Sequence, residues 1–125
     1  MEDTCTRANR RTAVNFTINV VNSVHGRPAE GVDVCIVSDA DGTQVIHAQG
    51  RTGMRGEFRC ADLDIASCYG KTHRIEIDIE SYFATFGLTS WNKRLSLFFC
   101  AYDLEHDQQV ICLIAPCSQA TLSVL

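Results

Sequence analysis

The sequence predicts an all-β fold, with two packed sheets of about eight strands in total and one short helix. Short runs that alternate apolar and polar residues recur between turn signals rich in Gly, Pro and Asp, a pattern typical of a β-sandwich. One stretch, 74–87, changes from this period of two to the period of a helix, because its alternating isoleucines give way to aromatic residues at helical spacing. Ser81 is placed to cap the start of that helix and Gly87 to end it.

Turn signals divide the first half of the chain into four strands. The first run alternates cleanly, and Pro28 then forces a turn. The dipeptide 41–42, Asp-Gly, predicts a hairpin, since glycine readily adopts the positive φ angle that such a turn requires. A tight connection then leads to a short strand that ends this half. We expect these strands at 15–22, 32–37, 43–48 and 57–59.

The second half begins with an irregular acidic stretch at 61–71. A loop follows the helix and holds the single tryptophan, Trp91, and Pro116 breaks the chain before the last strand. We expect the strands of this half at 74–79, 95–102, 109–115 and 121–125.

The run 109–115 differs from the other predicted strands because both of its faces are apolar. Val110, Cys112 and Ile114 form one face, and Ile111 and Leu113 form the other. A strand with two apolar faces is normally covered on both sides. In a two-sheet sandwich the outer face would otherwise meet water, so this strand predicts contact with another subunit.

Length and charge limit the class of protein. A chain of 125 residues, 46% hydrophobic and 21% charged, corresponds to one globular domain. We expect a mobile N-terminal arm at 1–13, which is polar and without period, and a sandwich domain at 14–125. A net charge of −4 argues against nucleic acid or an anionic membrane as the partner.

The seven cysteines are expected to be reduced. No Cys-x-x-Cys motif occurs, and the N-terminus has no apolar stretch that could serve as a signal peptide, so the protein is expected to be cytoplasmic. The ending 123–125, Ser-Val-Leu, has a faint likeness to a peroxisomal signal, which makes that location a less favoured alternative. A zinc site built from Cys112, Cys117 and His106 is possible but less favoured than simple packing, and we expect no metal and no cofactor.

Four stretches, in order, resemble the motifs of the transthyretin and 5-hydroxyisourate hydrolase family. They are 18–29, 52–57, 75–87 and 110–116, and the likeness extends over about 16–125. The resemblance implies a transthyretin-like β-sandwich whose monomers pair edge to edge, with two such dimers packed back to back around a central channel. In the hydrolase, sites in that channel open the ring of 5-hydroxyisourate, which is a step of urate breakdown. In transthyretin the corresponding sites bind thyroid hormone.

The catalytic positions of the hydrolase hold different residues here. Its first histidine position falls on Asn19, its arginine on Glu57 and its second histidine on Gln109, while the family's final Tyr-Arg-Gly-Ser falls on Leu122, Ser123, Val124 and Leu125. Asparagine and glutamine cannot relay protons at neutral pH, and a glutamate repels an anionic substrate. Catalytic sets that act as a unit lose most of their activity when one member is removed, so we expect no catalytic residues.

The resemblance also implies the lining of the channel. Transthyretin shares a glutamate at the position of Glu57, whereas its lysine position holds Asn19, so the carboxylate is kept without its basic partner. Such a channel suits a neutral or cationic small molecule rather than an anion. The expected lining is Asn19, Val21, Glu57, Gln109, Ile111, Leu113 and Ala120.

These observations favour a transthyretin-like binding or assembly protein that acts as a homotetramer without hydrolase chemistry. Two alternatives stay open: a 5-hydroxyisourate hydrolase with a rearranged site, and a structural subunit of a larger complex. For the first alternative, His106 is the nearest substitute for a missing histidine. We expect His25, His47 and His73 to face solvent.

Overall fold

The computed structural model describes residues 13–40, 42–64, 72–100, 107–116 and 119–124. This part of the chain forms strands almost throughout, together with one short helix. The elements are β1 (Ala13–Asn22), β2 (Arg27–Pro28), β3 (Asp33–Ala40), β4 (Thr43–Arg51), β5 (Glu57–Asp64), β6 (Thr72–Asp78), α3 (Ile79–Ala84), β7 (Arg94–Cys100), β8 (Gln108–Ile114) and β9 (Gln119–Val124).

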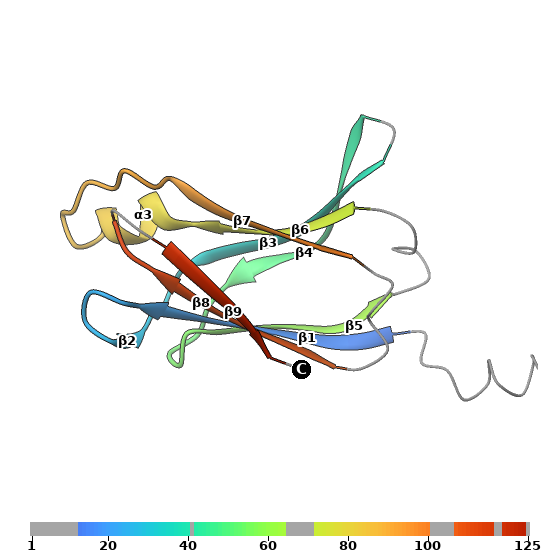
Figure 1. Ribbon diagram of the computed structural model, residues 1–125, viewed down its shortest axis with the longest axis horizontal. Coiled ribbons are helices and arrows are strands. Elements are labelled where there is room, and N and C mark those ends of the chain that lie inside the picture. Colours follow the sequence, from blue (N-terminus) through green and yellow to red (C-terminus); the bar gives the residue numbers. More distant parts are fainter. Residues whose placement is uncertain (1–12, 41, 65–71, 101–106, 117–118, 125) are drawn as a thin grey trace, which may run out of the picture.

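The strands form two sheets that pack face to face, as Figure 1 shows. In the first sheet the order is β2-β1-β8-β9, with β5 also paired to β1; in the second the order is β4-β3-β6-β7. The β1 and β8 strands run parallel, whereas the other strand pairs are antiparallel. The predicted all-β, two-sheet sandwich with one short helix is confirmed.

Alternating side chains bring an apolar layer between the two sheets. Ile18 and Val20 from β1 and Ile75 and Ile77 from β6 are fully buried. The helix closes one end of this layer with Phe83, which is also fully buried. Burial of a large aliphatic or aromatic side chain contributes about 1.5–3 kcal/mol, so this layer supplies the main driving force for folding.

The helix begins at Ile79, earlier than the predicted strand at 74–79 and a cap at Ser81 imply, and Ser81 is not its cap. Asp78 has extended backbone angles at the N-cap position, and its carboxylate accepts a hydrogen bond from the Ser81 N–H at 3.0 Å. Phe86 lies beyond the last helical turn and is 57% exposed. Gly87 follows with a φ of 74°, which is the conformation predicted for the residue that ends the helix.

Several strands have other bounds than the sequence predicted, and β5 differs most. The short strand expected at 57–59 extends to Asp64, because its backbone pairs with β1 as far as the partners Ala13 and Asp64. Backbone pairing there outweighs the polar, irregular composition that predicted a loop from 61 onward. The structure also adds β2, whose two residues pair with the end of β1. The expected arm at 1–13 lies outside the described residues except for Ala13, which already belongs to β1.

No helix in the described residues is long and apolar enough to cross a membrane.

Candidate ligand-binding face

The first sheet has a partly exposed surface on the side turned away from the core, which we call the outer face. In β1, Ile18 and Val20 point into the sandwich, whereas Thr17, Asn19 and Val21 are half-buried on the opposite side. The same alternation continues in β5 and β8, which flank β1. The outer face is therefore assembled from three strands that are far apart in sequence.

Six of the seven residues predicted to line the channel lie on this outer face, and their backbones are cross-strand neighbours. Asn19 pairs with Glu57 of β5 on one side and with Ile111 of β8 on the other. Val21 pairs with Leu113, one step along the same strands. Gln109 lies on the same side of β8 as these two residues and pairs with Thr17. All six have half-buried or exposed side chains: Asn19, Val21, Glu57, Gln109, Ile111 and Leu113.

The seventh residue, Ala120, lies on β9, where its backbone pairs with Leu113. The last family positions fall on the same strand, with Leu122 paired to Ile111 and Val124 to Gln109. Ser123 pairs with Val110, while Leu125 lies outside the described residues. The cross-strand neighbours that pair β1 with β8 on the outer face thus continue, through backbone pairing, into β9.

The outer face changes in polarity along the strand direction. At the end nearer the helix, Val21, Ile111 and Leu113 provide an apolar surface, and Leu113 is 39% exposed. Toward the other end the surface is polar and consists of Thr17, Gln109 and the Glu57–Arg59 ion pair. A surface of this kind suits a molecule with an apolar body and a polar end.

Sequence reasoning missed Arg59, which is part of this charged pair. Its Nε donates a hydrogen bond to Glu57 Oε1 at 2.8 Å, and its side chain is 74% exposed against 34% for Glu57. Arg59 also lines a pocket of about 320 Å³ together with Asn15, Thr17 and Asp107. The two-residue spacing from Glu57 was the signal, because a strand places residues i and i+2 on one face. The outer face is therefore less acidic than Glu57 alone implied.

The prediction that three histidines face solvent is correct only for His25, which lies in an exposed turn. His73 of β6 is 1% exposed, and His47 of β4 is half-buried. The two rings meet edge to face with centroids 5.5 Å apart, and His47 Nε2 lies 2.8 Å from the hydroxyl of the buried Ser38. A bulge in the pairing of β3 with β4, between Ile36 and Val37, interrupts the regular alternation beside His47.

No histidine among the described residues lies on a strand of the outer face. His47 and His73 belong to the second sheet, and His106, the suggested substitute for a missing catalytic histidine, is outside the described residues. Asn19 and Gln109 lie on neighbouring strands of this face, and neither amide can take up a proton near neutral pH.

Cys35 and Cys112 are free thiols. Cys60 and Cys112 are buried, and Cys35 is half-buried on the second sheet. Burial and the nearby carboxylate of Glu76 raise the pKa of the Cys35 thiol. Cys112 points into the core, while His106 and Cys117 lie outside the described residues, so the suggested zinc site stays a prediction. No cluster of three metal-ligating side chains occurs within the described ranges.

The comparison with known proteins bears on the fold. Over 88% of its length the chain superimposes on sea bream transthyretin, determined in complex with thyroxine, with a TM-score of 0.76. This is a transthyretin-like fold. The match covers 94% of the transthyretin chain at 23% sequence identity, so it extends across both sheets but shows the fold alone. No protein-family model matches the sequence.

Proposed function

We propose that this protein with a transthyretin-like fold binds a small molecule on the outer face, without catalysing its conversion, in a tetramer formed by two dimers. The observation that carries the proposal is the outward side of β8, where Ile111 and Leu113 are partly exposed beside the Glu57–Arg59 pair. An apolar surface of this kind on a sheet is normally covered by a partner or a ligand. A second copy packed against it would enclose the ligand.

The absence of a proton relay supports binding rather than hydrolysis. Ring opening requires groups that accept and return protons, and histidines serve that purpose near neutral pH. The two family histidine positions hold Asn19 and Gln109, and the described imidazoles lie elsewhere in the fold. Amides at these places can orient a ligand by hydrogen bonds but cannot transfer its protons.

The charges on the outer face support a ligand without net negative charge. Glu57 is the less exposed member of its pair, and its carboxylate is held by the Arg59 Nε. Asp107 adds a second carboxylate at the polar end. Two carboxylates against one guanidinium favour a neutral or cationic molecule over an anion.

A pair of indole compounds of similar size tests this proposal. Neutral tryptophol should raise the melting temperature of the wild-type protein, whereas anionic indole-3-acetate should raise it less or not at all, since only ligands that bind the folded state stabilise it. Leu113→Lys should abolish the tryptophol shift, because it places a charge on the apolar end of the outer face. Leu88→Lys is the matched control, since Leu88 is 43% exposed on a loop after the helix. Equal shifts in both variants would contradict the proposal.

One observation favours the alternative of a rearranged hydrolase. Arg59 supplies a guanidinium two residues from the family's arginine position and on the same face. We expect the decay of freshly prepared 5-hydroxyisourate, followed by absorbance, to proceed at the uncatalysed rate in the presence of the protein. Acceleration by orders of magnitude that Arg59→Gln removes would replace the binding proposal with the hydrolase.

A further inference from the structure

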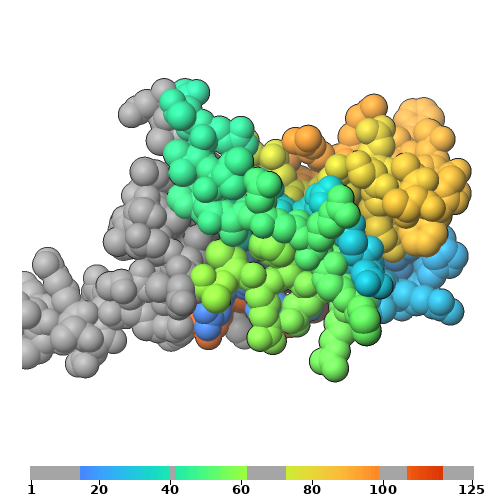
Figure 2. Space-filling view, turned by 180° about the vertical axis from the view of Figure 1, so that it is seen from behind, coloured from blue at the N-terminus to red at the C-terminus, as the bar shows by residue number. Residues whose placement is uncertain are grey.

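A second concave surface lies on the opposite side of the molecule from the outer face. It has a volume of about 530 Å³, which is within the range of small-molecule sites, and all four strands of the second sheet contribute to it. Figure 2 shows the molecule from the edge at which β4 and β5 lie in front, and at the top of this view the surface dips between the teal-green residues of β4 and the yellow residues of β6 and α3. We call it the second-sheet groove, lined by Asp33, Val34, Cys35, Gln49, Gly50, Arg51, Glu76, Asp78 and Arg94.

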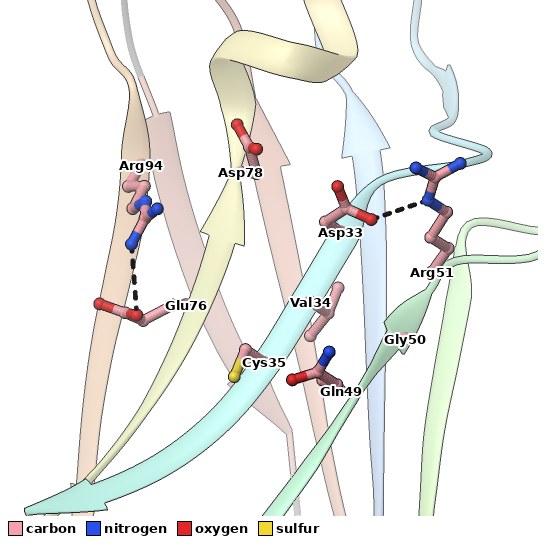
Figure 3. Close-up of a pocket in the computed structure, with 9 residues that line it drawn as sticks. All are labelled: Asp33, Val34, Cys35, Gln49, Gly50, Arg51, Glu76, Asp78 and Arg94. Atoms are coloured by element: carbon pink, nitrogen blue, oxygen red, sulfur yellow. Dashed lines mark hydrogen bonds and ion pairs between the residues drawn. The ribbon is translucent and has the colours of Figure 1, made fainter. Parts of the chain in front are cut away.

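Both guanidinium groups of the groove already have partners within the chain. Arg51 Nε donates to Asp33 Oδ1 at 2.8 Å on the β4 side, and Arg94 lies 3.6 Å from Glu76 on the β7 side. Figure 3 shows these two pairs at opposite walls. Glu76 is also held by Arg74, whose Nε is 3.2 Å away. Both cations of the groove are therefore paired with carboxylates, Arg51 with Asp33 and Arg94 with Glu76.

The carboxylate of Asp78 has no cationic partner among the described residues. Its two oxygens accept hydrogen bonds from the Ser81 N–H at 3.0 Å and the Ser81 hydroxyl at 2.8 Å, which are neutral donors. A carboxylate has about four acceptor sites, so Asp78 can accept further hydrogen bonds beyond these two. The lining as a whole carries three carboxylates against two guanidinium groups, a net charge of −1.

Strand register places a second carboxylate beside Asp78. Val34 pairs with Ile77, so the preceding Asp33 and the following Asp78 are neighbours on adjacent strands. Figure 3 shows both side chains at the same end of the groove. Arg51 already compensates the charge of Asp33, so Asp78 is the carboxylate at this end that a bound cation would neutralise, with Asp33 adding to the attraction.

We propose that the second-sheet groove binds a small organic cation, an amine with a compact hydrocarbon body. The ammonium lies at Asp78, beside the Asp33–Arg51 pair, and the hydrocarbon body covers the uncharged residues Cys35 and Gly50. An anion is disfavoured because both guanidinium groups are paired. A second copy of the chain is disfavoured because it would bring two surfaces of net negative charge together. The groove is formed within one chain and on the other sheet, so this proposal does not depend on the function proposed for the outer face.

Phenethylamine, phenethyl alcohol and phenylacetate test the proposal, because they share one hydrocarbon body and differ in charge. Cys35 lies in the groove, so its alkylation by iodoacetamide, quantified by peptide mass spectrometry, reports occupancy. We expect phenethylamine to slow the alkylation of Cys35 saturably, and the alcohol and the carboxylate to have little effect. Calorimetric titration should give the same order of affinities.

Two variants locate the charge that matters. Asp78→Asn should weaken phenethylamine binding by about tenfold or more while keeping the helix, since asparagine is an equally good N-cap. Glu80→Gln is the control: it removes a carboxylate from the same helical turn, one that pairs with Lys93 at 3.1 Å and does not line the groove. Circular dichroism serves to check that both variants fold. Unprotected Cys35 in the wild type, or equal affinities in the two variants, would overturn the proposal.

Discussion

Replacing Gly56 by alanine is expected to lower the free energy of unfolding by about 2–6 kcal/mol. Gly56 has a φ of 71°, where a side chain costs about 1–3 kcal/mol in backbone strain. A Cβ at this position would also collide with the carbonyl oxygen of Val20 and lie 3.0 Å from the Ala29 nitrogen, and overpacking of this kind adds about 1–3 kcal/mol. The close approach exists because the Gly56 carbonyl accepts a hydrogen bond from the Val20 N–H at 2.7 Å. Since Gly56 immediately precedes Glu57, the same contact fixes one end of the outer face.

Gly87→Ala separates the two causes. Gly87 has a similar φ of 74°, but a Cβ there would meet nothing within 4 Å. It should therefore cost only the backbone strain, about 1–3 kcal/mol. Urea denaturation of both variants measures the difference. Equal losses at the two positions would show that the contact with Val20 contributes nothing.

The second large effect is a loss of stability at alkaline pH that depends on Cys112. Burial raises the pKa of this thiol from 9.0 to about 12. Between these values the unfolded chain loses the thiol proton while the folded chain keeps it. The contribution is therefore complete below about pH 9, and the free energy of unfolding falls above it by up to roughly 1.4 kcal/mol per pH unit.

Cys112→Ala tests this assignment. The variant should be less stable than the wild type near pH 7, because it leaves a small cavity in β8, but its stability should decline less steeply between pH 9 and 11. Lysine and tyrosine side chains titrate in both proteins, so only the difference between the two curves reports the thiol. Chemical denaturation at each pH gives that difference, and parallel curves would contradict the assignment.

Hydrophobic alternation was sufficient to predict the two sheets and most of their strands. It worked because each strand has one side in the core, as in the alternation of Ile75 and Ile77 with Glu76. It failed for the far end of β5, where backbone pairing to β1 compensates for a polar sequence. The same alternation places His73 in the core with Ile75 and Ile77, so its burial was predictable from its spacing.

The candidate site was predictable in part. The family resemblance grouped Asn19, Glu57 and Ile111, and the structure places them in one cross-strand row. Arg59 does not fall on a family position, so the resemblance did not indicate it. The strand period alone puts Arg59 on the same face as Glu57. The second-sheet groove has no sequence motif: it depends on the registers that align β3, β6 and β7, which a single sequence does not specify.

Size-exclusion chromatography with light scattering tests most directly the claim that the outer face joins copies of the chain around a ligand site. A tetramer joined at the outer face predicts the mass of four chains for the wild type and for the control Leu88→Lys. It predicts a smaller mass for Leu113→Lys, because a buried charge without a partner would disrupt the contact between dimers. A wild-type protein that remains monomeric at all concentrations, or a Leu113→Lys variant with an unchanged mass, would contradict it.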